Sequence, residues 1–489
     1  MSYPSLLFSG PAAGRRIQAH VFEDVKLTAF FSEESIGAMR VLCRPEDIPV
    51  RQDLLRFLDE QAPVREILSR LEAVSCEMLR LHAALQEVKC ENERHYIFVG
   101  LMAAVADFAS LAASLPDRGG PLLRRFSARF RADLADGDWA KMAEEAKGLR
   151  QKAEEARRET FRMAGDNLWM RPDFQESYVE RLLRCAADLG LPPEQKGRDV
   201  SIRLDARMVN ALARLHPESF LAFRDFYGRC KERFDASILS YRFELGFYLE
   251  ALRLMDRIRA VGLPLCWPRI AEEKRLEIRG LYDISLLLKE GTEIVPNDAL
   301  FTREEPFFFL TGANGGGKTT YLRAIANAVL LFLSGCPICA DSGEIWPFGC
   351  VFTHFPQDER FEADGRYADE QRRVSEILEA HGGNSLILLN ETYSTTNEEL
   401  AVSSTLELTE KLKDSGSFVL YITHQHGLES AQVPFLSVIV DEDDQNRRTY
   451  RIARRTEAES SYAADILRRY GLDGPSLARR FPGNGGMQA

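Results

Sequence analysis

The chain has 489 residues, a formal net charge of -11 and 45% hydrophobic residues. A single hydrophobic core usually stops growing at about 250–300 residues, so a chain of this length is expected to form two or three domains. The negative net charge excludes a protein whose whole surface has a positive electrostatic potential. Nucleic acid would therefore have to be met by a local basic patch.

The N-terminus and the cysteines both indicate a cytoplasmic protein. The first residues, MSYPSLLFSGPAAGRR, lack a basic start followed by a sustained apolar run, and no window holds eighteen uninterrupted apolar residues. We therefore expect neither secretion nor contact with a membrane. The nine cysteines lack the paired spacings of a disulfide scaffold, which is typical of a reducing compartment.

Cys336 and Cys339 form a C-x-x-C pattern in SGCPICADSG. Such a pattern belongs either to a redox or metal pair, or to two small apolar residues that follow a helix. A metal site would need a second C-x-x-C or a nearby histidine pair, and the chain has neither. We therefore interpret these cysteines as structural.

Residues 1–275 have the pattern of a mostly helical core and lever domain. Between residues 220 and 258 apolar side chains recur every three or four positions, which predicts one amphipathic helix of unusual length. About forty residues at 1.5 Å per residue reach roughly 60 Å, so this helix would act as a strut. Gly262, Pro264 and Pro268 end it.

A second helical stretch, residues 139–162, predicts a short coiled-coil arm. Its apolar face consists of Ala146, Leu149, Ala153 and Ala156. Glu154 and Arg158 lie four positions apart on the other face, where opposite charges support a helix. The stretch is either an arm that contacts DNA or a partner protein, or a solvated helix that packs on its neighbour.

From residue 276 to about 475 the pattern changes to short apolar runs separated by glycine-rich turns and helices. The runs are PFFFL, CVFTHF, SLILL, FVLYI and LSVIV. Runs this short and this uniformly apolar suit strands that are buried on both faces. The sequence therefore predicts an α/β domain over residues 276–475, followed by a tail over residues 476–489.

The stretch TGANGGGKTT, residues 311–320, satisfies the phosphate-loop pattern G-x-x-x-x-G-K-[ST] between a strand and a helix. Its glycines allow backbone N–H groups to turn inward around phosphates, and the helix N-terminus adds positive potential. Lys318 is expected to reach the β- and γ-phosphates, and the Thr319 hydroxyl to ligate Mg²⁺. The predicted nucleotide-binding residues of the loop are Gly312, Ala313, Gly315, Gly316, Gly317, Lys318, Thr319 and Thr320.

A phosphate loop needs a partner strand that ends in acidic residues, and NSLILLNET is the candidate. In the usual arrangement an aspartate holds the water shell of Mg²⁺, and the following glutamate polarises the attacking water. Here Asn390 takes the first position and Glu391 the second. Asn390 accepts a hydrogen bond but lacks the charge, so weaker Mg²⁺ binding or slower hydrolysis is expected. Glu391 is the predicted base; otherwise it caps the following helix.

His424 follows the predicted strand FVLYI and is a candidate catalytic residue. Beside the previous strand, it would lie at the γ-phosphate side, where it can sense or stabilise the transferred group. A lone histidine after a strand is otherwise structural. The order of this motif behind the other two favours the functional interpretation.

The assembled motifs resemble the ATPase domain of the MutS family, the DNA mismatch repair proteins. In family order they are VPNDALF, FFFLTGANGGGKTTYLRAIANAVLLFLSG, FTHFPQDERFEADGRYADE, SLILLNET and YITHQHGL. The resemblance covers residues 276–475 and implies an ABC-like P-loop fold. It implies that Asn314 lies close to the loop backbone and Asn297 near the adenine or ribose. It also implies a dimer in which the partner's loops cover each nucleotide.

The helical half resembles the core and lever helices of the same family more weakly, through IPVRQDLLRFL and CWPRI. Where the family carries a glycine-serine-threonine signature, this chain reads DGRYADE, and we hypothesise that Arg366 supplies a charge across the dimer. The chain begins almost directly in lever-like helices and stops at RRFPGNGGMQA. We therefore expect no mismatch-recognition or connector domain and no C-terminal nuclease module.

The resemblance implies a dimeric ATPase, with ATP and Mg²⁺ as cofactors, whose levers open and close a clamp in DNA mismatch repair or a related pathway. DNA would be gripped through its backbone or as a branched structure, and a repair protein is a further expected partner. The alternative is a nucleotide-gated protein-interaction switch with slow or no hydrolysis and no DNA binding. A small-molecule kinase is disfavoured, because no acceptor-site pattern follows the phosphate loop.

Overall fold

The computed structural model contains two compact units. One consists of Met1–Leu6 and Arg56–Leu249, and the other of Leu7–Leu55 and Glu250–Ala489. The structure describes residues 3–10, 16–157, 160–164, 167–171, 206–289, 293–355, 363–380, 382–393, 398–440 and 448–455, with the single positions 476 and 480. The predicted tail therefore lies almost entirely outside the described residues.

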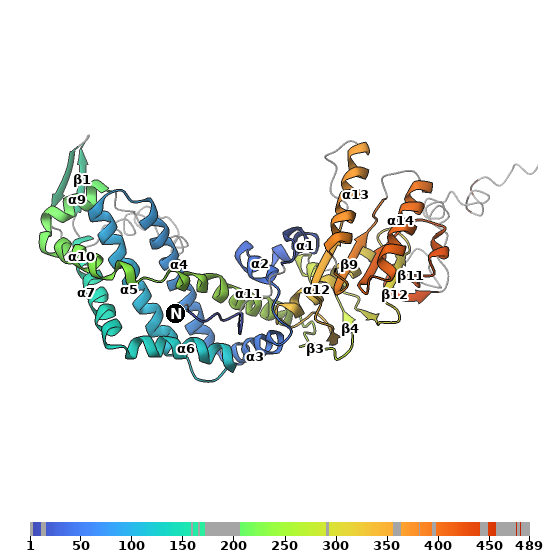
Figure 1. Cartoon of the computed structure of the whole chain (residues 1–489), viewed down its shortest axis with the longest axis horizontal. Coiled ribbons are helices and arrows are strands. Elements are labelled where there is room, and N and C mark those ends of the chain that lie inside the picture. Colours follow the sequence, from blue (N-terminus) through green and yellow to red (C-terminus); the bar gives the residue numbers. More distant parts are fainter. Residues whose placement is uncertain are drawn as a thin grey trace, which may run out of the picture. The chain divides into compact units, whose positions relative to one another are not determined.

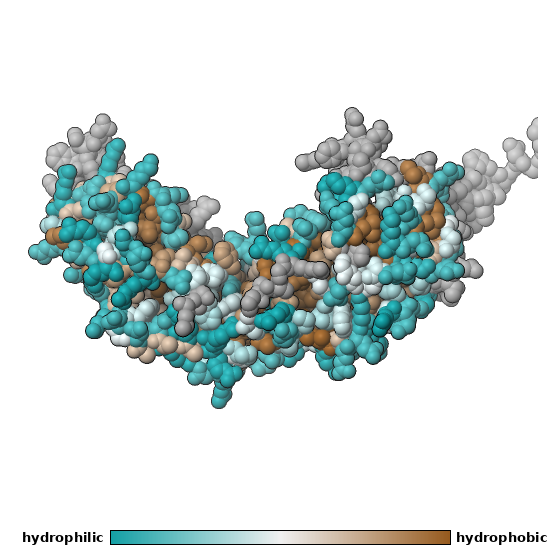
Figure 2. Space-filling view, viewed as in Figure 1, coloured by the Kyte–Doolittle hydropathy of each residue, from teal (hydrophilic) through white to brown (hydrophobic). Residues whose placement is uncertain are grey.

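The first unit is a helical bundle around a central helix. Its helices are α4 (Ala62–Glu87), α5 (Glu91–Ala113), α6 (Gly120–Ala135), α7 (Gly137–Arg157), α9 (Ala206–Leu215) and α10 (Pro217–Cys230). Helix α5 packs against all of the others (Figure 1). It is long and apolar enough to cross a membrane, but 67% of its most apolar window is buried inside the protein. The surface seen in Figure 2 is mostly hydrophilic. Helix α5 is thus the core helix of the bundle.

Helix α7 packs on its neighbour, which is the second of the two interpretations of residues 139–162. Ala146, Leu149 and Ala153 are buried in one cluster with Phe98 and Val99 of α5. The helix ends at Arg157, and β1 (Thr160–Ala164) pairs antiparallel with β2 (Asn167–Arg171). The predicted coiled-coil arm is therefore wrong in its extent, because a β-hairpin begins within it.

The predicted single strut over residues 220–258 is also wrong. Between α10 and α11 (Tyr241–Ala260) lie two 3-10 turns, η3 (Lys231–Arg233) and η4 (Ala236–Ser240). Asp235 is extended, and its Oδ1 accepts a hydrogen bond of 2.9 Å from the Ser237 N–H. Such a side-chain bond satisfies a backbone donor outside a helix and so favours a break. The apolar periodicity continues across the break, so the sequence pattern does not indicate where the helix ends.

The second unit is built on a six-stranded sheet in the order β12-β11-β6-β10-β9-β8. The strands are β6 (Phe307–Thr311), β8 (Cys350–His354), β9 (Ser385–Asn390), β10 (Phe418–Ile422), β11 (Phe435–Val440) and β12 (Arg448–Arg455). All neighbours from β11 to β8 pair in parallel, and β12 is antiparallel. Every residue of β6, β8, β9 and β10 is buried. The five predicted strands are confirmed.

Helices and a smaller sheet surround this sheet (Figure 1). The helices are α12 (Lys318–Leu333), α13 (Ala363–Ala380) and α14 (Glu398–Lys413), with the short turn η6 (Leu428–Ala431). The smaller sheet has the order β3-β7-β4-β5 and consists of β3 (Arg269–Ile270), β7 (Ser342–Ile345), β4 (Leu276–Leu281) and β5 (Asn297–Phe301). The turn η5 (Ile284–Leu288) follows β4.

The N-terminal segment belongs to this α/β unit, which differs from the predicted division at residue 275. Its elements are α1 (Ala19–Asp24), η1 (Leu27–Ala29), α2 (Glu33–Arg40) and the start of α3 (Asp47–Glu60). The buried Arg51 donates from Nε to the Leu7 carbonyl at 2.6 Å and from Nη1 to the Ser334 carbonyl, the C-cap of α12, at 3.4 Å. The Thr353 hydroxyl bonds Asp24 at 2.6 Å. The contacts with Ser334 and Thr353 join segments that are 283 and 329 positions apart.

Cys336 and Cys339 are buried in this unit, where they line a small apolar cavity with Pro337 and Leu265. Burial raises the pKa of both thiols to about 12, so neither forms a reactive thiolate at neutral pH. In the described part of the chain no three His, Cys, Asp or Glu side chains group as a metal site. These facts favour the structural interpretation of the C-x-x-C.

Candidate nucleotide site

The phosphate loop connects β6 to α12 and depends on its glycines. Gly312, Gly315 and Gly317 have φ angles of 121°, 73° and 94°, a region that side chains with a Cβ rarely adopt. A Cβ on Gly316 would lie 2.9 Å from the Ala313 carbonyl oxygen, and one on Gly312 would lie 3.1 Å from the side chain of Val438. The loop therefore forms a close-packed turn that only glycine allows, as a phosphate cradle requires.

Lys318 is the first residue of α12 and is buried against the loop. Its Nζ donates to the carbonyls of Gly312 at 2.8 Å and Ala313 at 3.1 Å. The ammonium group thus lies over the loop, at the helix end where unpaired N–H groups add partial positive charge. A positive side chain beside a positive helix terminus suits an anionic phosphate.

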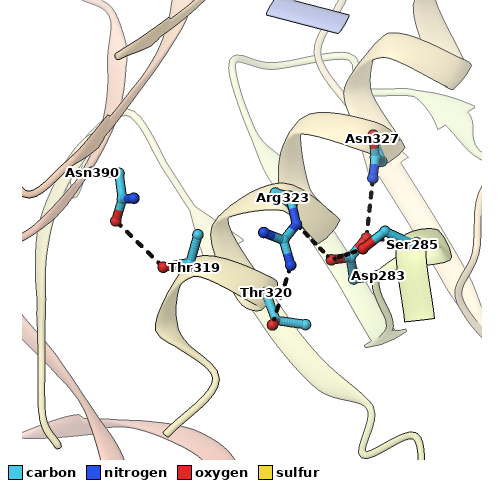
Figure 3. Close-up of polar contacts among 7 residues, drawn as sticks. All are labelled: Asp283, Ser285, Thr319, Thr320, Arg323, Asn327 and Asn390. Atoms are coloured by element: carbon cyan, nitrogen blue, oxygen red, sulfur yellow. Dashed lines mark hydrogen bonds and ion pairs between the residues drawn. The ribbon is translucent and has the colours of Figure 1, made fainter. Parts of the chain in front are cut away.

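Strands β6, β10 and β9 are parallel neighbours, so their carboxyl ends meet at one edge of the sheet. There the Thr319 hydroxyl donates to Oδ1 of Asn390 at 3.4 Å (Figure 3). Asn390 is 7% exposed. The structure therefore brings together the two residues predicted to hold Mg²⁺, although they are 71 positions apart.

Glu391 and His424 lie at the same edge, and their side chains meet. The distance from His424 Nε2 to Glu391 Oε1 is 3.1 Å. A carboxylate only accepts hydrogen bonds, so Nε2 carries the proton. This bond lowers the pKa of Glu391, and the positive charge of Lys318 lowers it further. Glu391 is thus ionised at neutral pH, and its contact with His424 favours a base over a helix cap.

Asn297, predicted to lie near the adenine or ribose, bonds a segment that the sequence analysis missed. Its Oδ1 accepts from the Ile452 N–H at 2.7 Å, and its Nδ2 donates to the Tyr450 carbonyl at 2.9 Å. Tyr450 is 45% exposed, and a Cβ on Gly317 would lie 3.4 Å from its ring. Asn297 therefore holds an exposed aromatic ring beside the loop, while its own contact with nucleotide stays a prediction. The surrounding sequence, RRTYR, contains no motif that would identify Tyr450 as a residue of the nucleotide site.

Two further predicted residues lie around the loop. Asn314 is exposed within the loop, and its predicted position close to the loop backbone stays a prediction. Arg366 lies in α13, and its side chain is outside the described residues, so its role across a dimer stays a prediction. Thr320, on the first turn of α12, accepts from Nη2 of Arg323 at 3.5 Å.

A buried ionic network holds the helix that follows the loop (Figure 3). The Asp283 side chain is fully buried and pairs with Nε of Arg323 at 2.9 Å. It also accepts from Asn327 Nδ2 at 3.3 Å and from the Ser285 N–H at 2.9 Å. Arg323 and Asn327 lie one turn apart on α12, whereas Asp283 precedes η5. The network therefore ties α12 to the segment between β4 and β5.

Replacing Arg323 with methionine is expected to lower the free energy of unfolding by about 3–5 kcal/mol, because the Asp283 carboxylate stays buried without its cation. Urea unfolding measures the effect. The double variant Asp283→Asn/Arg323→Met removes both charges and is expected to recover part of the loss. A single variant as stable as the wild type would show that the pair contributes nothing.

The comparisons with known proteins agree with this geometry. Residues 308–474 match the family model of MutS domain V. The chain is 28% identical over 212 residues to the Endonuclease MutS2 of Streptococcus uberis, a match that covers 42% of this chain and 26% of that protein. It is 26% identical over 224 residues to the DNA mismatch repair protein MutS of Chlorobium limicola, with 44% and 26% covered.

The family-model match lies within the α/β unit, and much of each relative stays unmatched. The chain spans about a quarter of the length of the curated relatives it matches. The matched segment carries the phosphate loop, Asn390, Glu391 and His424. Residues 308–474 are thus a MutS domain V, and through this P-loop domain the chain is similar to members of the MutS family.

Proposed function

We propose that this chain binds ATP with Mg²⁺ and hydrolyses it. The observation that carries the proposal is the Glu391–His424 pair, 3.1 Å apart at the sheet edge where Lys318 and Thr319 begin α12. A base held beside a phosphate cradle is the arrangement that hydrolysis of a terminal phosphate requires.

The residues of the site divide the work of binding and hydrolysis in this proposal. Lys318 neutralises the terminal phosphates, and the Thr319 hydroxyl would hold Mg²⁺, with Asn390 acting through water. Bound Mg²⁺ supplies positive charge to the phosphate oxygens. Glu391 orients and deprotonates the attacking water. The proton on His424 Nε2 holds the Glu391 carboxylate and stabilises the negative charge that develops at the transferred group.

The whole chain is proposed to act as a homodimeric clamp on DNA, joined through its ATPase domains, in the cytoplasm. The names of the relatives, a mismatch repair protein and an endonuclease of the same family, support a role in mismatch repair or a related DNA transaction. Because the net charge is -11, the grip on the DNA backbone would have to come from a local basic patch. A repair protein is the proposed further partner.

The proposal is tested by measuring ATP hydrolysis with and without Mg²⁺, and with linear, mismatched or branched DNA. Retention of each DNA is measured in parallel at several salt concentrations, because backbone contacts weaken as salt rises. DNA-stimulated hydrolysis is the expected result. Nucleotide binding without turnover and without DNA retention would replace the motor with a nucleotide-gated switch.

Replacing Asn390 with aspartate is expected to lower the Mg²⁺ concentration that gives half-maximal hydrolysis by roughly 5- to 10-fold. The added charge faces the cation through one water, where attraction of about 1 kcal/mol is reasonable. The matched control is Asn210→Asp, whose Oδ1 accepts from Asn92 Nδ2 at 2.9 Å in the other unit. An unchanged Mg²⁺ requirement in Asn390→Asp would place Mg²⁺ elsewhere.

A further inference from the structure

The segment Glu391–Tyr393, directly after β9, has an unusual backbone. Glu391 has a φ of 52° and Tyr393 a φ of 65°. Both values lie in the left-handed region, which costs free energy for any residue with a Cβ. Two such residues flank Thr392, so the segment needs contacts that hold it. Backbone strain of this kind gathers at functional sites.

The left-handed turn decides where the Glu391 side chain points. Along an extended strand, successive side chains point to opposite faces. Asn390 directs its amide toward Thr319, so an extended residue 391 would point away from that side. The left-handed conformation removes this alternation. It allows Asn390 and Glu391 to serve the same site, where Glu391 meets His424.

Thr392 is the anchor of this turn, and the strands β10 and β8 bind it directly. It is 1% exposed. Its carbonyl accepts from the Tyr421 hydroxyl of β10 at 2.8 Å, and its own hydroxyl contacts Nδ1 of His354 at the end of β8 at 3.0 Å. The Tyr421 hydroxyl also lies 3.1 Å from the Thr405 hydroxyl of α14. The turn is thus bonded from both neighbouring strands of the sheet and braced by a helix.

We propose that Tyr421 and His354 are positioning residues that hold Thr392, and so keep Glu391 in the left-handed conformation that aims its carboxylate at the attacking water. Neither side chain touches the nucleotide in this scheme. The inference rests on the proposed ATP hydrolysis. Its consequence is specific: loosening the turn slows the chemical step and leaves the phosphate cradle of Gly312–Thr319 intact.

The principal test is Tyr421→Phe, which keeps the ring and removes the hydroxyl. We expect kcat to fall by roughly 10- to 100-fold, as when a catalytic group moves by about 1 Å, with KM for ATP unchanged. The matched control is Tyr248→Phe, which also removes a buried hydroxyl that donates to a carbonyl, that of Leu6, at 2.8 Å. The control is expected to keep wild-type kcat. An unchanged kcat in Tyr421→Phe would overturn the inference. A rise in KM for ATP by the same factor as the fall in kcat would also overturn it.

Thr392 offers a second pair of variants should Tyr421→Phe fold poorly. Thr392→Val keeps the branched shape but removes the hydroxyl that meets His354, whereas Thr392→Ser keeps the hydroxyl. The valine variant is expected to lower kcat by roughly tenfold, and the serine variant to restore it. Equal activity of the two variants would remove His354 from the proposal.

A readout without ATP separates this inference from the proposed function. The ring ¹⁵N signals of His424, identified by their loss in His424→Ala, report its bond to Glu391. In Tyr421→Phe these signals are expected to move toward their positions in Glu391→Gln. Unchanged signals would overturn the inference even in an active enzyme. The wild-type protein could show no turnover while the His424 signals of Tyr421→Phe shift as expected. This pair of results would refute hydrolysis and leave the positioning of Glu391 supported.

Discussion

Replacing Lys318 with alanine is expected to weaken ATP binding by about two orders of magnitude. Hydrogen bonds from a charged donor contribute about 1.5–3 kcal/mol each, and about 2.7 kcal/mol corresponds to a hundredfold change in Kd. In the structure the Lys318 ammonium donates to the loop carbonyls of Gly312 and Ala313, next to the predicted phosphate position. Isothermal titration calorimetry with ATP and Mg²⁺ measures the loss.

Lys274 provides the matched control for this variant. Its Nζ also donates to two backbone carbonyls, of Gly383 at 2.8 Å and of Gly416. These glycines precede β9 and β10, at the opposite edge of the sheet from the phosphate loop. Lys274→Ala is therefore expected to bind ATP as the wild type does. Equal affinity of Lys318→Ala and Lys274→Ala would refute a nucleotide at the loop.

Replacing Glu391 with glutamine is expected to reduce kcat by roughly 10²–10⁴-fold and leave the Kd for ATP within a few-fold of wild type. The amide keeps the size of the carboxylate but cannot accept the proton of the attacking water. Single-turnover hydrolysis and ATP titration measure the two quantities separately. The control Glu277→Gln changes a carboxylate that pairs with Arg279 at 3.1 Å on β4, and is expected to keep full activity. Hydrolysis retained by Glu391→Gln would exclude it as the base.

The pH profile gives an independent check on the same residue. The hydrogen bond from His424 lowers the pKa of Glu391, so its ionised form persists to lower pH than in an ordinary glutamate. The acid limb of kcat/KM is therefore expected below the ordinary range near pH 4.3. The His424→Ala variant loses the hydrogen bond that lowers the pKa of Glu391, whereas burial still raises this pKa. The acid limb of kcat/KM is therefore expected to move to higher pH in His424→Ala. A limb at the same pH in both proteins would show that the pair does not control the base.

The strands and the phosphate loop were predictable because their signals are local. A run such as SLILL can only be a buried strand or a buried helix, and its length and its flanking turns favour the strand. The loop residues from Gly312 to Thr319 are adjacent in sequence, so their spacing alone defines a phosphate cradle. Glu391 follows β9 directly and His424 follows β10 after one residue, and parallel strands place their carboxyl ends together.

The break in the long helix at Asp235 was not predicted, because both halves keep the same apolar period and the periodicity dominates the pattern. The membership of residues 7–55 in the α/β unit was also invisible, since Arg51 and Ser334 are 283 positions apart. Tyr450 lies beside the loop because β12 pairs with β11 and Asn297 bonds the backbone of β12.

The sequence by itself determined the class of the second unit, the phosphate loop and the residue types at the strand ends, since each is encoded over fewer than about ten neighbouring positions. Only the tertiary structure decided which way Glu391 faces. That direction depends on a left-handed backbone at Glu391, held through Thr392 by Tyr421 and His354. Contacts between strands distant in sequence hold this conformation against its intrinsic cost, and no local pattern records them.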